Sequence, residues 1–285
     1  MNQAASKNNN AGRFKVLLRQ SIKWLVYSLL LVNFGLYFIE ELEFARHTLR
    51  AGGTILDWTK AFATTADEFA WFGLLFLFEL ETYALSDEVL KPWLQRSLHV
   101  LRLVCYVFLA HTIYAWGDEV YNVQNLQPDQ EFTSVCQMAD LDISFTRNFK
   151  YTLIDGKNCS TLGSGPVFYK LEKTVYTDVS GLATTKRLAW VDLIEAAAWL
   201  LIVFTIELAI WLQARNITGG RLMMVSYSGK ALYAVLFGAA IFWAYKGHWL
   251  YTWDELLWIG GFFAIELNMK LWREEIAVEE KLAGY

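Results

Sequence analysis

Proline, cysteine and histidine are all scarce in this sequence, and each shortage excludes a class of protein. Only 3 Pro, 3 Cys and 4 His occur among 285 residues. The cysteines lie far apart and the histidines form neither an HExxH nor an ExxH pattern, so a zinc or di-iron centre has little support. The chain has no long basic run and a net charge of −4, which argues against nucleic-acid binding. We therefore expect neither a cofactor nor a nucleic-acid partner.

Apolar residues are abundant instead, at 55% of the chain, and they gather into long runs. Six of these runs have the length needed to cross a bilayer core. The expected spans are residues 24–43, 68–85, 98–116, 189–213, 230–245 and 253–272. The sequence therefore predicts an all-α integral membrane protein with six transmembrane helices, whose first partner is the lipid bilayer.

The distribution of basic residues predicts the orientation of these spans. Several, including Arg19 and Lys23, precede the first span and place the N-terminus in the cytoplasm by the positive-inside rule. Six crossings return the C-terminus to the same side. Arg46, Arg50 and Lys60 in the first outer loop oppose this bias. We expect a multi-pass protein of the plasma membrane, or of the cell inner membrane in a bacterium, with both termini cytoplasmic.

These spans divide the chain into five parts. They are a basic cytoplasmic N-terminus (1–23), transmembrane helices 1–3 (24–117), an extracytoplasmic insertion (118–188), transmembrane helices 4–6 (189–273) and an acidic cytoplasmic tail (274–285). The grouping of apolar runs alone supports this division.

The insertion carries signals of its own. Stretches beginning near Phe149, Val167 and Lys173 are typical of strands, so we expect a small β-rich structure there. Cys136 and Cys159 both fall in this part of the chain, and an oxidising exterior would preserve a disulfide between them. Two unpaired thiols in a loop are the alternative.

A pattern of Trp, Phe and Glu-Leu occurs three times, in the second, fourth and sixth expected spans. The copies are Trp71…Phe76-x-Phe78-Glu79-Leu80, Trp199…Phe204-x-Ile206-Glu207-Leu208 and Trp258…Phe263-x-Ile265-Glu266-Leu267. Such self-similarity predicts that the membrane domain consists of three repeated helical hairpins.

The repeat places Glu79, Glu207 and Glu266 at a similar depth, a little cytoplasmic of the bilayer midplane. A charged side chain facing lipid there would cost about 3 kcal/mol, so these acids must face the bundle interior, be protonated or have partners. Glu81 adjoins the first copy without a counterpart in the others. Because carboxylates bind protons and hard cations such as Na⁺ and Ca²⁺, we interpret these four residues as an ion- or proton-binding site.

Basic residues offer an alternative interpretation of the same acids. The first, third and fifth spans each carry a basic residue followed by a Tyr, and the basic residues could form interhelical ion pairs with the glutamates. The basic residues and the tyrosines that follow them are Lys23…Tyr27, Arg102…Tyr106 and Lys230…Tyr233.

A second set of acids precedes the central glutamates by eleven or twelve residues. Glu68, Glu195 and Glu255, together with Asp67, Asp192 and Asp254, would form an acidic vestibule at the outer side that concentrates cations. Equally, acids at these positions could be helix N-terminal residues that interact favourably with the helix dipole.

Together these patterns favour a channel or transporter for a proton or a monovalent or divalent cation. The alternative is a non-enzymatic scaffold or assembly partner, acting as a homo-oligomer or with another membrane protein, in which the glutamates hold helices together. An enzyme is less favoured, because no nucleophile–base pair or metal-ligand set accompanies the acids. No expected span contains an internal Pro, which counts against a classical secondary transporter.

Overall fold

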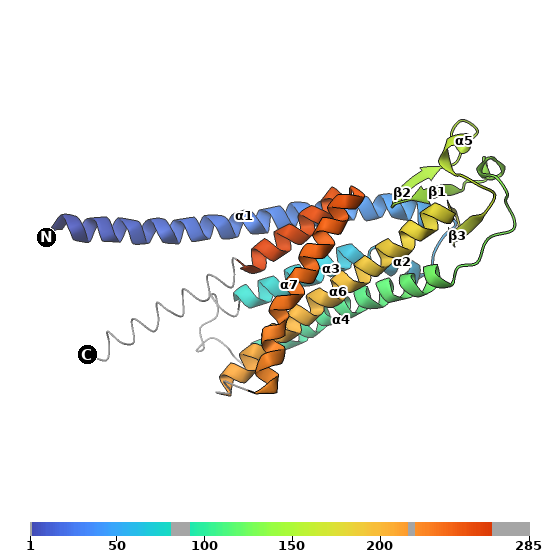
Figure 1. The fold of residues 1–285 in the computed structure, drawn as a ribbon. Coiled ribbons are helices and arrows are strands. Elements are labelled where there is room, and N and C mark those ends of the chain that lie inside the picture. The colour runs from blue at the N-terminus through green and yellow to red at the C-terminus, as the bar shows by residue number, and fades with distance from the viewer. Residues whose placement is uncertain (1, 81–91, 216–219, 264–285) are drawn as a thin grey trace. The chain divides into compact units, whose positions relative to one another are not determined.

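The computed structural model describes residues 2–80, 92–215 and 220–263, and most of this chain is helical (Figure 1). The long helices are α1 (Asn2–Thr48), α3 (Ala63–Glu79), α4 (Pro92–Asn125), α6 (Val179–Ala214) and α7 (Arg221–Lys246), and residues 249–263 form a further helix. The acidic tail expected at 274–285 lies outside the described residues.

Four helical segments are long and apolar enough to cross a membrane. They are Gln20–Thr48, Pro92–Asn125, Val179–Leu208 and Ser228–Lys246. They indicate a membrane protein, and they include the first, third and fifth expected spans and most of the fourth. Helix α3 has 17 residues and the last helix is described only to residue 263, so six spans in three repeated hairpins remain a prediction.

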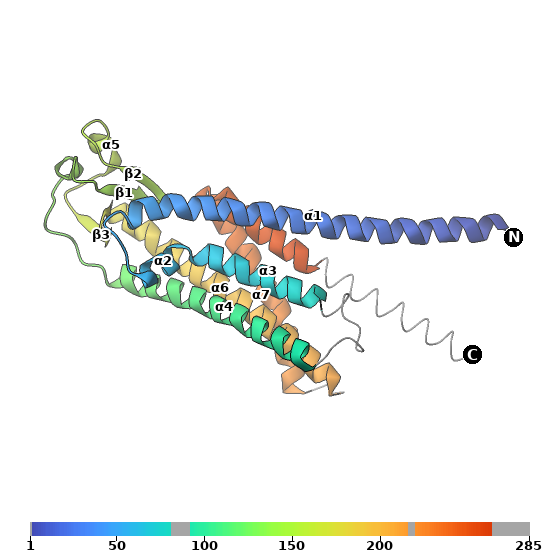
Figure 2. The same ribbon diagram turned by 180° about the vertical axis from the view of Figure 1, so that it is seen from behind.

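The chain divides into two compact units, residues 1–35 with 236–285 and residues 36–235. In the second unit α3 packs against α4, and α4 packs against α6, as the view from behind shows (Figure 2).

Glycines allow the helices of this unit to approach closely. A Cβ added at Gly73 of α3 would lie 2.7 Å from Sγ of Cys105 on α4. A Cβ added at Gly229 of α7 would lie 2.1 Å from Oγ1 of Thr205 on α6. Membrane helices gain contact area at such small residues, because lipid tails supply no hydrophobic driving force between them.

The chain that connects α4 to α6, residues 126–178, forms a small mixed sheet, and we call this part the cap. Its strands are β1 (Ser144–Arg147), β2 (Lys150–Leu153), β3 (Phe168–Glu172) and β4 (Val175–Asp178), in the order β2-β1-β4-β3. Strands β1 and β4 are parallel, and the outer pairs are antiparallel. At the β1–β2 turn both Asn148 (φ 55°) and Phe149 (φ 57°) have the left-handed backbone of a type I′ hairpin. The expected β structure in the insertion is confirmed.

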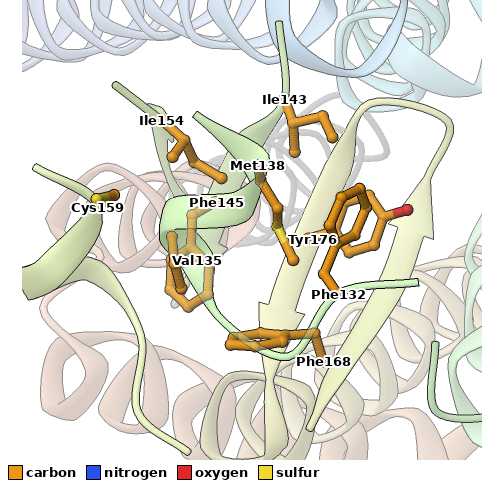
Figure 3. Packing of buried hydrophobic residues seen from close by; sticks show 9 residues of the cluster. All are labelled: Phe132, Val135, Met138, Ile143, Phe145, Ile154, Cys159, Phe168 and Tyr176. Atoms are coloured by element: carbon orange, nitrogen blue, oxygen red, sulfur yellow. The ribbon is translucent and has the colours of Figure 1, made fainter. Parts of the chain in front are cut away.

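The cap has a hydrophobic core of its own (Figure 3). Phe132 and Tyr176 meet edge to face with ring centroids 5.6 Å apart, and Met138 is fully buried beside them. Cys136, in a 3₁₀ helix (Val135–Met138), is joined by a disulfide to Cys159, the first residue of α5 (Cys159–Leu162). The structure therefore contains the expected disulfide.

Strand β4 leads directly into α6 through Asp178, which caps that helix. The Oδ1 atom of Asp178 accepts hydrogen bonds from the Gly181 N–H and the Ser180 hydroxyl, both at 2.8 Å. The Arg147 guanidinium donates to Oδ2 of Asp178. Burial acts to raise the pKa of Asp178, but the backbone bond from Gly181 and its other partners outweigh burial, so its pKa is lowered.

The end of α1 also contacts the sheet, through His47. His47 Nδ1 lies 2.8 Å from Oγ of Ser144, and the Thr174 hydroxyl donates to the His47 carbonyl oxygen at 2.7 Å. The His47 and Tyr151 rings stack at 5.6 Å. The part of the expected insertion (118–188) that lies outside the long helices is shorter than expected, because α4 extends to Asn125 and α6 begins at Val179.

Candidate functional site

Glu207 is the one central glutamate whose side chain lies among the described residues. It lies on α6, is exposed, and its Oε1 accepts a hydrogen bond from the Tyr106 hydroxyl of α4. Glu79 ends α3, but its side chain, and all of Glu81 and Glu266, lie outside what the structure describes. The convergence of the three glutamates therefore remains a prediction.

A tyrosine of the basic-Tyr pattern is a hydrogen-bond partner of Glu207. Tyr106 follows Arg102 by one helical turn on α4, so the basic-Tyr pattern in the sequence pointed to the correct helix face. Lys230 is exposed on α7, and the side chain of Lys23 lies outside the described residues. The Tyr106 contact adds a hydroxyl partner for Glu207, and the ion pair expected with Arg102 stays a prediction.

The tryptophans of the first two repeat copies contact each other. The Trp71 and Trp199 rings meet edge to face at 5.9 Å, and both side chains are buried. Trp71 Nε1 also donates to Oδ2 of Asp67 at 3.0 Å. These residues bring corresponding positions of α3 and α6 together.

The outer acids are buried rather than open to solvent. Glu68 is 3% exposed, Glu255 is fully buried and Glu195 is half-buried. None of them occupies the first turn of its helix: α3 begins at Ala63 and α6 begins at Val179. The helix-dipole explanation therefore does not account for Glu68 or Glu195.

Asp192, one turn before Glu195 on α6, belongs to the same acidic group. It is 8% exposed, and its Oδ2 has no hydrogen-bond partner among the described residues. It interacts electrostatically with Glu195 and with Glu119 of α4. The α4–α6 contact nearby is apolar and includes Val120 and Ala189. The buried Asp192 thus lies within electrostatic reach of one half-buried acid on its own helix and one on α4.

A lysine lies at the edge of this group. Lys60, on the short helix α2 (Ile55–Ala61), bonds through Nζ to Oδ2 of Asp118 at 2.5 Å. Burial acts to lower the pKa of Lys60, but the hydrogen bond to Asp118 and its charge outweigh burial, so the pKa is raised. Glu119 also feels the charge of Lys60, and of Glu172 on β3.

A separate polar contact lies in the unit of residues 1–35 and 236–285. Asn33 of α1 donates through Nδ2 to Oδ1 of Asp254 at 2.5 Å, and both residues are buried. Glu255 adjoins Asp254 and is fully buried. This contact joins α1 to the helix of residues 249–263.

Neither a metal-binding cluster nor a known relative identifies the site. Among the described residues, no group of three or more His, Cys, Asp and Glu side chains is arranged to hold a metal ion. No protein-family model, curated protein or solved structure matches the chain, so its function has to be inferred from its own residues.

Proposed function

We propose that this protein binds and moves a proton or a cation across the plasma membrane, or the cell inner membrane of a bacterium, as a channel or transporter. Carboxylates within its helices would form the path, with the group around Asp192 at the outer side and Glu79, Glu207 and Glu266 nearer the cytoplasm. Both termini would be cytoplasmic. The path could lie within one chain or between copies of a homo-oligomer.

The burial of Asp192 is the observation that carries this proposal. It is more than nine-tenths buried, with Oδ2 lacking a hydrogen-bond partner in the described structure, on a helix apolar enough to span a membrane. A buried ionised carboxylate without a partner is costly, and apolar residues of similar size often stabilise a fold better than buried charges do. Ionisable residues inside membrane segments commonly serve ion pathways and proton relays, which gives these acids a reason to be there.

The second candidate is a membrane scaffold, and two contacts favour it. Glu207 with Tyr106, and Asp254 with Asn33, each join different helices through a hydrogen bond. An interhelical hydrogen bond in a membrane contributes about 0.6–2 kcal/mol, enough to fix how two helices pack. A protein with only this role would need no ion path.

Ion flux in proteoliposomes separates the two candidates. The wild type, Asp192→Asn and the triple variant Glu79→Gln/Glu207→Gln/Glu266→Gln would be compared under Na⁺, K⁺, Ca²⁺ and pH gradients. Asp142→Asn makes the same chemical change at an exposed acid of the cap and serves as the matched control. Equal folding and insertion would be established first.

We expect flux of one ion in the wild type and the control, and its loss in the two test variants. Tyr106→Phe addresses the scaffold, because it removes one hydroxyl and should weaken α4–α6 packing by about 1 kcal/mol. A wild type that inserts but passes no tested ion, together with a Tyr106→Phe variant that loses assembly, would overturn the transport proposal in favour of the scaffold.

A further inference from the structure

Asp192 and Glu195 lie three residues apart on α6 and therefore share one face of the helix. Glu119 of α4 faces them, and the charges of Glu119 and Glu195 both act on Asp192. Val120, next to Glu119 on α4, and Ala189, three residues before Asp192 on α6, belong to one buried apolar cluster. If all three acids were ionised, the charges of Glu119 and Glu195 would oppose a charge on the buried Asp192.

Further charged groups surround this cluster on the elements packed against it. The charges of Asp118 on α4, Lys60 on α2 and Glu172 on β3 act on Glu119. Tyr151 of β2 lies close enough to feel Glu119 and Glu172. Lys60 is a positive charge that acts on Glu119, and its ammonium group is hydrogen-bonded to Asp118. Its attraction is thus directed mainly to another acid.

We propose that Glu119, Asp192 and Glu195 form a proton-binding site at the outer part of the membrane bundle, and that the transported ion is H⁺. This inference rests on the proposed function for its role in transport, but the proton site itself can be tested separately. A proton from the exterior binds Oδ2 of Asp192 and gives a neutral carboxylic acid. Its transfer to Glu119 or Glu195 restores the Asp192 carboxylate and leaves the total charge of the cluster unchanged.

The placement of the acids favours a proton over a metal ion, because no group of three or more His, Cys, Asp and Glu side chains among the described residues is arranged to hold a metal. Ca²⁺ takes about six to eight oxygen ligands around one point, whereas a proton needs a single carboxylate oxygen. Asp192 provides one buried Oδ2 without a hydrogen-bond partner in the described structure. Protonation removes one charge from the cluster and gives that oxygen a hydrogen to donate.

Infrared spectroscopy tests the proton site without relying on transport. The C=O stretch of a protonated carboxyl would be recorded for the full chain in proteoliposomes, titrated from acid to alkaline pH in H₂O and D₂O. We expect a band that shifts in D₂O and persists at neutral pH, where exposed carboxyls are ionised. It should be lost in Asp192→Asn and retained in Asp142→Asn. Wild-type protein labelled with ¹³C-aspartate should show a shifted band, which keeps the test valid if Asp192→Asn does not fold.

The outcomes separate the site from the function. A neutral-pH band that belongs to aspartate and disappears in Asp192→Asn supports the site even if no ion flux is found, in which case the proposed function fails alone. If protons are transported but no such band is seen, or if Asp192→Asn transports protons as fast as the wild type, the site is overturned while the transport function stands. Flux of Na⁺, K⁺ or Ca²⁺ without H⁺ overturns the identity of the ion.

Discussion

The cap and the membrane helices bury their apolar side chains in opposite ways. In the cap, Phe168 and Tyr176 are each 1% exposed and lie in a closed core. On the candidate membrane helices, large apolar side chains face outward: Val107 of α4 is 62% exposed and Phe204 of α6 is 58% exposed. The cap is built like a small domain in water, whereas the helices have the outward-facing apolar surface expected in lipid.

This difference implies different sources of stability. The cap gains stability from apolar burial and from a crosslink between Cys136 and Cys159. Helices in lipid gain little free energy when lipid contacts are replaced by contacts with other apolar side chains. Their association therefore depends on close packing at small residues and on polar contacts. Gly73 of α3 and the Tyr106–Glu207 hydrogen bond are contacts of these two kinds.

The largest expected effect on the cap comes from removing its disulfide. Because the bond closes a loop between residues 23 apart, Cys136→Ser/Cys159→Ser should destabilise the cap by about 3 kcal/mol, by the loss of loop-closure entropy. Hydrogen exchange followed by mass spectrometry should show faster exchange in β1–β4 and little change in α3 and α4.

Cys105→Ala is the control for this experiment, because it removes the buried free thiol of α4 without touching the crosslink. It should leave cap exchange unchanged. If the double serine variant accelerated exchange in α3 and α4 as much as in the cap, the two regions would be one cooperative unit and the comparison would break down.

A smaller effect is expected at the α3–α4 contact. Gly73→Ala places a Cβ 2.7 Å from Sγ of Cys105, so the helices must separate slightly, at a cost of about 2 kcal/mol. Thermal unfolding in detergent should show the loss, and adding Cys105→Ala should restore most of it by removing the sulfur atom.

Gly117→Ala provides the matched control on α4, because a Cβ at Gly117 would have no atom within 4 Å. It should be neutral or stabilise the helix by up to about 1 kcal/mol, since Ala favours a helix more than Gly does. Equal destabilisation by Gly73→Ala and Gly117→Ala would show that loss of glycine, rather than the contact with Cys105, is responsible.

The sequence predicted the membrane character and the cap well, because both depend on local patterns. Apolar runs located the long helices, and the position of two cysteines in one polar stretch predicted the disulfide. Strand β1 was missed, and its parallel pairing with β4 joins Ser144 to Val175, far along the chain. Pairing over such a distance depends on tertiary contacts that a local pattern does not contain.

The candidate site was predicted only in part, for a related reason. Repeated motifs drew attention to Glu68 and Glu195, and Asp192 was expected beside them as an outer acid, but its interaction with Glu119 on another helix was not predicted. Helix periodicity shows that Asp192 and Glu195 share a face, but it does not show that α4 packs against that face. The burial of Asp192 could therefore be found only once the packing of α4 on α6 was known.

The smallest expected effect is a pH dependence at the junction between the two regions. Asp178 has a lowered pKa in the folded protein, so its carboxylate contributes stability above the unfolded-chain pKa of about 4, and this contribution is lost as the pH falls through the lower folded value. Asp178→Asn keeps an oxygen that can accept the Gly181 N–H but has no charge for Arg147. Asp178→Ala loses both interactions and should lower the free energy of unfolding by about 1 kcal/mol. Acid titration of cap unfolding should therefore be shallower in both variants than in the wild type, and only Asp178→Ala should loosen the first turn of α6 in hydrogen exchange at neutral pH. A titration as steep in Asp178→Asn as in the wild type would show that the acid sensitivity of the cap arises from other carboxylates. The junction would then be held by the hydrogen bond to the Gly181 N–H and not by the charge of Asp178.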